Sequence, residues 1–192
     1  QNLNSNANII VAPSDHLITN ENEFIRIVKE CLEMSSKEDC LITLGIKPSR
    51  PETGYGYIQY SEECSVQNKN LKRVKTFTEK PDLEIAQQFL DSGDFLWNSG
   101  MFIWSVEAIM SSMKDLLPEM YDLFNEDYNV YNTEKESEFI DRVFPACKNI
   151  SIDYGIMEKS KNVFVYPSDF GWSDLGTWGS LSSHLDSDLE NN

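Results

Sequence analysis

The first quarter of the chain alternates between two apolar runs and one amphipathic segment, and this order limits the possible fold more than any other feature. The runs at residues 8–12 and 40–46 have the length and the β-branched content of buried strands. Residues 21–34 carry apolar side chains three and four positions apart, and Thr19 or Asn20 can cap the helix that this spacing predicts. A strand, a helix and a second strand predict a βαβ unit with a parallel pair of strands. The chain is therefore expected to be an α/β protein.

The remaining sequence continues this alternation of strands and helices. Strands are expected at residues 55–60, 71–79, 101–104 and 163–166. Helices are expected at residues 82–90, 106–142 with two breaks, 151–158 and 175–185. Polar loops are expected at residues 47–56 and 61–70, and a turn at 97–100. No internal repeat or second domain boundary is visible, so residues 1–192 are expected to form one domain.

The composition excludes several classes of partner. The chain has 32 acidic and 16 basic residues, a net charge of −16, which argues against broad binding to nucleic acid or to anionic membranes. It leaves room for a phosphorylated small substrate, because a few placed cations and a metal act locally. The four cysteines form no CxxC pair and have no histidine at metal-ligand spacing, so neither a zinc site nor a disulfide framework is expected. The sequence has no signal-peptide pattern and no bilayer-length apolar run, and we expect a cytoplasmic protein.

Two aspartates stand where a ligand site is expected. Asp15 follows the first apolar run, and open α/β sheets bind ligands beyond the carboxyl ends of their strands. Asp174 lies far downstream in residues 170–178, a segment that also holds two glycines and two tryptophans. Together the two carboxylates could hold one divalent cation. Alternatively, Ser173 or Asp174 caps the start of a helix.

The loop before residue 58 combines glycines with cations. Gly54 and Gly56 flank Tyr55, and glycines at the start of a strand let the backbone approach a ligand closely. The preceding Lys47 and Arg50 suit a phosphate or a pyrophosphate group. The alternative is a simple hairpin entry.

Three further places offer polar groups suited to a sugar phosphate. Glu79 can take sugar hydroxyls while Lys80 takes a phosphate, or the two form a surface ion pair of little energetic weight. Asn98 can donate and accept hydrogen bonds at once, which suits vicinal hydroxyls, or it makes a local turn. Asp153 lies in the first turn of a short expected helix, where an acidic residue also complements the helix dipole.

The joint order of these motifs resembles the sugar-nucleotide pyrophosphorylases, and among them the mannose-1-phosphate guanylyltransferases. The matching segments are PSDHLI at 13–18, ETGYGYI at 52–58, FTEKP at 77–81, WNSGMFIW at 97–104, SIDYGIMEKS at 151–160 and FGWSDLGTW at 170–178. The resemblance covers roughly residues 9–181. It implies a partial Rossmann-like, nucleotide-diphospho-sugar transferase fold, with a mixed, mostly parallel sheet and flanking helices.

The resemblance also implies a reaction, in which GTP and mannose 1-phosphate give GDP-mannose and pyrophosphate. The sugar phosphate attacks the α-phosphorus directly, so catalysis consists of positioning and charge neutralisation. By this resemblance Asp15 and Asp174 are catalytic ligands of Mg²⁺, which prefers a few carboxylates together with phosphate oxygens and water. Lys80 is the catalytic cation that neutralises the sugar phosphate.

The same resemblance assigns substrate-binding roles to several other residues. The backbone of Gly54, Tyr55 and Gly56, together with Glu79 and Asn98, is expected to hold the mannose. Two further residues are expected around the pocket, with Asp153 supporting it and Trp172 forming a wall near the metal.

One departure from the family pattern is large. The family has a glycine-rich loop carrying an Arg and followed by Lys-Pro, which grips the nucleotide, and no such element is found here. We therefore expect this chain to be a fragment, the C-terminal sugar- and metal-binding part of a catalytic domain. We also expect it to lack activity alone. A sheet cut in its middle exposes a strand edge, so a homodimer is a further expectation. Two alternatives stay open: another sugar-1-phosphate nucleotidyltransferase, and a non-catalytic sugar-nucleotide-binding paralogue.

Overall fold

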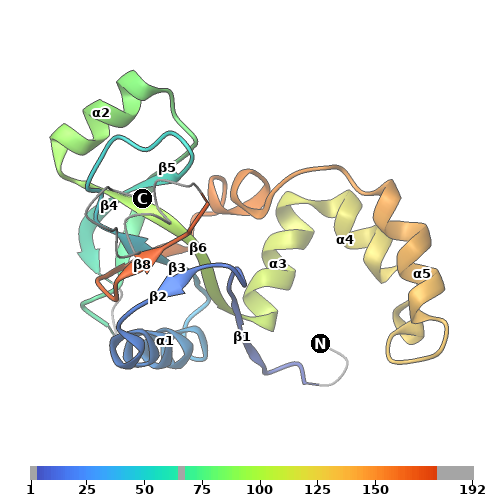
Figure 1. The fold of residues 1–192 in the computed structure, drawn as a ribbon. Coiled ribbons are helices and arrows are strands. Elements are labelled where there is room, and N and C mark those ends of the chain that lie inside the picture. The colour runs from blue at the N-terminus through green and yellow to red at the C-terminus, as the bar shows by residue number, and fades with distance from the viewer. Residues whose placement is uncertain (1–3, 65–67, 177–192) are drawn as a thin grey trace, which may run out of the picture.

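Six strands form the main sheet of the protein (Figure 1). The computed structural model describes residues 4–64 and 68–176. The strand order across the sheet is β1 (Asn8–Val11), β6 (Phe95–Ser105), β3 (Leu41–Ile46), β7 (Val163–Ser168), β5 (Lys72–Glu79) and β4 (Gly56–Cys64). The long β6 lies beside β3 on one side, and on the other side it pairs with β1 and also with β4. This strand therefore connects the two ends of the sheet.

The expectation of a mostly parallel sheet is wrong, although the α/β class, the mixed sheet and the flanking helices are confirmed. Among the described strands, only β3 and β7 pair in parallel. The strand–helix–strand order of the first 46 residues is also confirmed, but β1 and β3 do not pair with each other. Both are antiparallel to β6, which lies between them. The pattern of the first segment could not reveal this, because the inserted strand comes from about fifty residues further along the chain.

Helix α1 (Glu21–Ser35) covers one face of the sheet. The side chain of Asn20 accepts a hydrogen bond from the Glu23 N–H at 3.2 Å, so Asn20 is the N-cap. The helix buries its apolar stripe against residues of the sheet that include Ile42, Leu44 and Ile103. The helix predicted at residues 21–34 is therefore confirmed, and its cap is Asn20 rather than Thr19.

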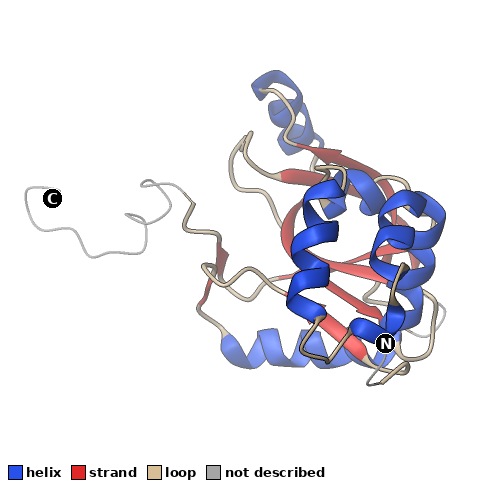
Figure 2. Ribbon diagram, turned by 90° about the vertical axis from the view of Figure 1, so that its right-hand side faces the viewer, coloured by secondary structure: helices blue, strands red, loops and turns tan. Residues whose placement is uncertain are grey.

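The opposite face is covered by α3 (Val106–Leu116) and by the π-helical turn η3 (Asp153–Met157). Ser105 ends β6 and caps α3, since its hydroxyl accepts from the Ala108 N–H at 3.1 Å. Figure 2 shows helices of this side in front of the strands. Beyond α3 an arm extends from the sheet with its own small apolar cluster, as Figure 1 shows at the right. The arm consists of α4 (Pro118–Asn125), η1 (Tyr128–Val130), α5 (Glu136–Val143) and η2 (Phe144–Ala146).

Two smaller elements complete the region around the expected site. Helix α2 (Leu83–Ser92) is capped by Asp82 and packs Ala86 against Tyr57 and Trp97. Strands β2 (Leu17–Ile18) and β8 (Trp172–Ser173) form a separate two-stranded antiparallel sheet. Among the described helices none has the length and apolar character needed to cross a bilayer.

Three local expectations differ from the structure. The turn expected at residues 97–100 is part of the continuous strand β6, in which only Gly100 adopts a positive φ of 71°. Strand β4 continues to Cys64, into the stretch expected to be a polar loop. Residues 174–176 are not helical, and Leu175 has a φ of 52°, so the cap expected at Ser173 or Asp174 does not begin a helix there. The remainder of the helix expected at 175–185 lies outside the described residues.

Candidate active site

A cavity of about 210 Å³ brings together segments from the whole length of the chain. All of the residues to which the resemblance assigns a role, except Asp15, line it. They are Gly54, Tyr55, Gly56, Glu79, Lys80, Asn98, Asp153, Trp172 and Asp174. The volume is below the range of roughly 300–1,000 Å³ that is usual for drug-sized ligands, so it suits one sugar ring better than a whole nucleotide sugar.

The small sheet of β2 and β8 lies next to both expected metal ligands, since Asp15 precedes β2 and Asp174 follows β8. Leu17 pairs with Ser173 and Ile18 with Trp172, in antiparallel register. Continuing this register outward by one residue places His16 opposite Asp174. Asp15 itself does not line the cavity, but the charges of Asp15 and Asp174 both act on His16.

His16 lines the cavity and was not among the expected site residues. The Trp172 indole Nε1–H donates to His16 Nδ1 at 3.1 Å, and the two rings meet edge to face. A neutral imidazole that accepts at Nδ1 carries its proton on Nε2. Burial lowers the pKa of His16, while the two nearby carboxylates act in the opposite direction. Its position directly after Asp15 in the sequence was the signal that could have identified it.

Asp174 is held by Tyr55. The phenol donates to Asp174 Oδ1 at 2.6 Å, and burial, with this hydrogen bond, raises the pKa of Tyr55 above its ordinary range. Tyr55 therefore remains a donor, and it contributes a side chain to the site as well as the expected backbone. Among the described residues, no group of three or more His, Cys, Asp and Glu side chains could hold a metal ion. Asp15 and Asp174, whose charges both act on His16, are the carboxylates that could hold Mg²⁺, which prefers a few carboxylates together with phosphate oxygens and water.

Asn98 is fixed in place on three sides. Its Oδ1 accepts from the Thr43 hydroxyl at 2.8 Å and from the Gly100 N–H at 3.2 Å. Its amide nitrogen donates to Asp153 Oδ1 at 3.0 Å. Burial raises the pKa of Asp153, and the hydrogen bond from Asn98 partly opposes this shift. The local turn contact to Gly100 is thus real, yet it leaves one N–H of the Asn98 amide for a ligand.

The carboxylate of Glu79 is nearly buried and has few hydrogen-bond partners among the described residues. Its side chain is 11% exposed and lies 3.8 Å from the ammonium of Lys80, whose own side chain is 62% exposed. Among the described residues Glu79 Oε2 is buried and has no hydrogen-bond partner. It lies against the backbone of Gly56, its partner across β4 and β5, where a Cβ would overlap it. Burial, with the charge of Asp153, raises the pKa of Glu79 to about 7, and Lys80 opposes this.

Lys47 and Arg50 do not line this cavity. They line a neighbouring cavity of about 230 Å³, which shares Trp172 with the first. Arg50 forms a 3.0 Å ion pair with Glu52 and lies over the ring of Trp97, 5.3 Å from its centroid. The two cations for which the sequence suggested a phosphate role therefore lie outside the sugar-sized cavity.

Known proteins resemble this chain over nearly all of its length. The family model described as "Nucleotidyl transferase" matches residues 1–191. The mannose-1-phosphate guanylyltransferase of Salmonella montevideo is 36% identical over 99% of this chain and 41% of its own length. A protein of the same name from Escherichia coli is 36% identical over 93% of the chain and 39% of its own length.

A solved structure agrees with these sequences. It is described as mannose-1-phosphate geranyltransferase from Thermus thermophilus, and it superposes with a TM-score of 0.78 at 28% identity. The match covers 93% of this chain and 50% of that one. The chain thus spans about two fifths of the length of the curated relatives named above. By its match over the whole sequence, the chain belongs to the nucleotidyl transferase family.

Proposed function

We propose that this chain provides the sugar- and metal-binding part of a mannose-1-phosphate guanylyltransferase. The proposed reaction of the whole protein converts GTP and mannose 1-phosphate into GDP-mannose and pyrophosphate. One observation carries the proposal: residues 54–56, 79–80, 98, 153, 172 and 174 converge on one cavity, where the buried Glu79 Oε2 lacks a partner among the described residues. The names of the similar proteins support the same reaction.

The chemistry proposed for this site is positioning and charge neutralisation. Mg²⁺, bound to Asp15 and Asp174, would neutralise phosphate charge, as it does in other phosphoryl-transfer sites. Tyr55 orients Asp174 by donating to one of its oxygens, which leaves the other oxygen available. Lys80 projects its exposed ammonium beside the cavity, where it can meet the phosphate of the sugar.

The sugar hydroxyls would be held by groups that the described part of the chain leaves without full partners. Glu79 lines the cavity, and its carboxylate can accept a hydrogen bond, or donate one when it is protonated. Asn98 offers its remaining amide N–H, in an orientation set by Thr43 and Asp153. We also propose a cytoplasmic location, supported by the free buried thiols of Cys31 and Cys40, which suit a reducing compartment.

Calorimetric titration of GDP-mannose into the 192-residue chain, with Mg²⁺ and with EDTA, tests the proposal. We expect binding that requires Mg²⁺ and is lost in Asp174→Asn, because this change removes a carboxylate charge and keeps the shape. UDP-glucose serves as the competing ligand and should bind at least about tenfold more weakly, a difference of about 1.4 kcal/mol. Equal binding in Asp174→Asn would contradict the proposed metal role. Equal binding of UDP-glucose would favour a nucleotidyltransferase for another sugar.

The same preparation tests whether the chain can bind GDP-mannose without catalysing its formation. Because the chain spans about two fifths of its relatives' length, we expect it to bind GDP-mannose without producing it from GTP and mannose 1-phosphate. Release of pyrophosphate at a steady rate, abolished by Asp174→Asn, would show instead that the 192 residues suffice for the reaction.

A further inference from the structure

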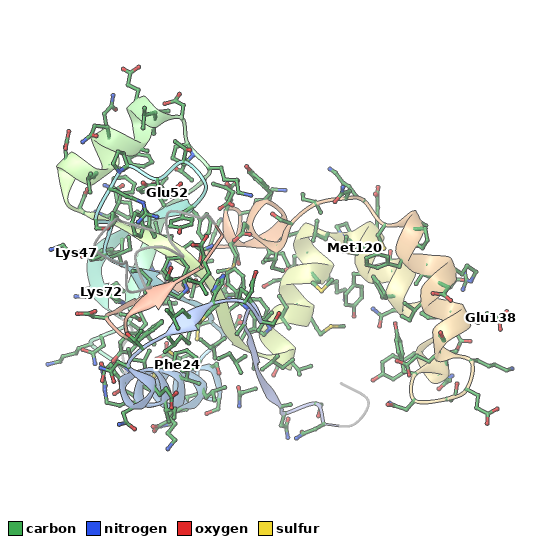
Figure 3. The ribbon with its side chains drawn as sticks, in the orientation of Figure 1. Phe24, Lys47, Glu52, Lys72, Met120 and Glu138 are labelled. Carbon is green, nitrogen blue, oxygen red and sulfur yellow. The ribbon has the colours of Figure 1, made fainter. Side chains whose placement is uncertain are left out.

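The second cavity lies where the two parallel strands end. Strands β3 and β7 run in the same direction, so Ile46 and Ser168 stand side by side at their carboxyl ends. In α/β sheets this edge is the usual place for ligands. The cavity of about 230 Å³ begins there, and Lys47, Arg50, Trp97, Asp169 and Trp172 are among its lining residues. Figure 3 labels Lys47 on this part of the molecule, well away from the arm that carries Met120 and Glu138.

The two cations at this cavity differ in how they are held. Arg50 is oriented by its ion pair with Glu52 and by stacking over Trp97 and, at 6.0 Å, over Tyr55. A guanidinium held in this way retains N–H groups that the single pair with Glu52 does not use. Lys47 follows β3 directly, is exposed, and forms no ion pair with the part of the chain that the structure describes.

The charge around the cavity is less negative than that of the molecule as a whole. The chain has a net charge of −16, but the ionic side chains lining this cavity are Lys47, Arg50 and Asp169. Glu52, which pairs with Arg50 at 3.0 Å, brings the local sum to zero. Interactions between exposed charges are screened beyond roughly 8–10 Å at physiological salt, so these near groups dominate over distant acidic residues.

The wall of the cavity includes an aromatic ring that holds one of the cations. Trp97 lines the cavity and is 4% exposed, and the guanidinium of Arg50 lies over its ring, 5.3 Å from the centroid. The cavity therefore combines a positioned guanidinium with a second cation, which together favour an anionic ligand.

We propose that this second cavity is a phosphate-binding subsite, separate from the sugar-sized cavity and divided from it by Trp172. Its ligand is a phosphate group, either of free phosphate or pyrophosphate or of a phosphorylated sugar. The volume admits such a group rather than a whole nucleotide sugar. The subsite goes beyond the proposed function, since neither Lys47 nor Arg50 lines the first cavity.

The test is a calorimetric titration of the 192-residue chain with inorganic phosphate, pyrophosphate and mannose 1-phosphate in turn, in EDTA. We expect binding of at least one of these ions, weakened about tenfold by Lys47→Gln and again by Arg50→Gln, as expected for the loss of one charge-assisted contact each. Preference for pyrophosphate or for mannose 1-phosphate identifies the source of the phosphate. Absence of binding by all three would overturn the proposal.

Matched controls separate this subsite from general charge effects and from the first cavity. Lys29→Gln removes an exposed lysine on α1, and Arg73→Gln removes an arginine that also stacks on an aromatic ring, Phe164, at 5.5 Å. Both controls should bind as the unmodified chain does, and equal weakening by them would also overturn the proposal. Asp174→Asn should leave this binding intact. Lys47→Gln and Arg50→Gln therefore test the phosphate-binding subsite, whereas Asp174→Asn tests the proposed metal site.

Discussion

At the scale of single residues, Glu79 is the most perturbed acid in the cavity. Its folded-state pKa of about 7 lies above the ordinary value of 4.5, because burial disfavours the charged form. A raised pKa means that the folded state binds the proton more tightly than the unfolded state does. The associated stability is fully present below pH 4.5 and is lost as the pH rises through 7.

This linkage predicts that Glu79→Gln stabilises the chain at high pH. The unfolding free energy of the variant should match that of the unmodified chain near pH 4.5 and exceed it by up to about 3 kcal/mol above pH 7. Urea denaturation at about pH 5 and pH 8 measures the difference, on either side of the folded-state pKa. Glu119→Gln, at an exposed position on α4, should show no such pH-dependent difference. A constant offset between Glu79→Gln and the unmodified chain would contradict the burial argument.

Gly56 offers a second test at the residue scale. A Cβ at this position would overlap Glu79 Oε2 and approach Asn98 Cβ at 3.3 Å. Since Glu79 is flexible at its end, we expect Gly56→Ala to change stability by less than about 1 kcal/mol but to displace the carboxylate. Displacement of a positioning group by about 1 Å can reduce function by up to about 100-fold, so GDP-mannose binding should weaken about tenfold or more.

Gly93→Ala is the control for that change. Gly93 lies outside the cavity, and its Cβ would meet nothing within 4 Å. Calorimetry should find its affinity for GDP-mannose within about twofold of the unmodified chain, which corresponds to about 0.4 kcal/mol. Equal losses in Gly93→Ala and Gly56→Ala would show that the stability of the fold, rather than Glu79, is disturbed.

At the scale of elements, the two-stranded sheet of β2 and β8 holds the expected metal ligands near each other. It consists of two residue pairs, and Gly171 directly precedes β8. The Gly171 carbonyl accepts from the Thr19 N–H at 3.1 Å, and a Cβ on Gly171 would overlap the Thr19 hydroxyl. Gly171 also has a φ of 65°, a conformation that other residues adopt at a cost.

We therefore predict that Gly171→Ala separates β2 from β8 and removes Mg²⁺-dependent binding of GDP-mannose. The change should cost about 1 kcal/mol for the backbone conformation alone, with the overlap adding to it. Gly93→Ala has the same backbone penalty, at a φ of 75°, but its Cβ would meet nothing within 4 Å. Urea denaturation measures the stability of both variants, and calorimetry measures their Mg²⁺-dependent binding of GDP-mannose. Retained Mg²⁺-dependent binding in Gly171→Ala would refute it.

At the scale of the whole molecule, β1 has an outer edge with which no described strand pairs. It is a terminal strand in the sheet order, and its residues Ile9, Ile10 and Val11 are 36%, 38% and 45% exposed. Unpaired apolar strand edges favour association with another strand. We therefore predict that the 192-residue chain forms a concentration-dependent homodimer through β1.

Ile10→Lys should suppress this dimer, because a lysine on an edge strand opposes strand pairing. Analytical ultracentrifugation between micromolar and hundred-micromolar concentrations measures the effect. Ile25→Lys places the same charge at a comparably exposed apolar position on α1 and should leave the dimer unchanged. A monomer at all concentrations, or a dimer unaffected by Ile10→Lys, would exclude this edge as the interface.

The sequence by itself determined the local elements. The 3.6-residue spacing, the capping side chains and the β-branched runs located α1, α2, α3 and most strands, because each signal reflects the burial of one segment. The motifs also identified the residues that line the sugar-sized cavity, although their roles remain proposals. His16 lies within the segment at residues 13–18, but the sequence does not reveal its role, because its contact with Trp172 crosses 156 residues of sequence.

Only the tertiary structure decided how these elements combine. The insertion of β6 between β1 and β3, and hence the mostly antiparallel sheet, depends on pairing between strands far apart in the chain. The separation of Lys47 and Arg50 from the sugar-sized cavity, and the raised pKa of Glu79, depend on which side chains become neighbours after folding. Periodicity reports whether a segment has a buried face. It carries no information about which distant segment covers that face, and that choice determines the chemistry of the site.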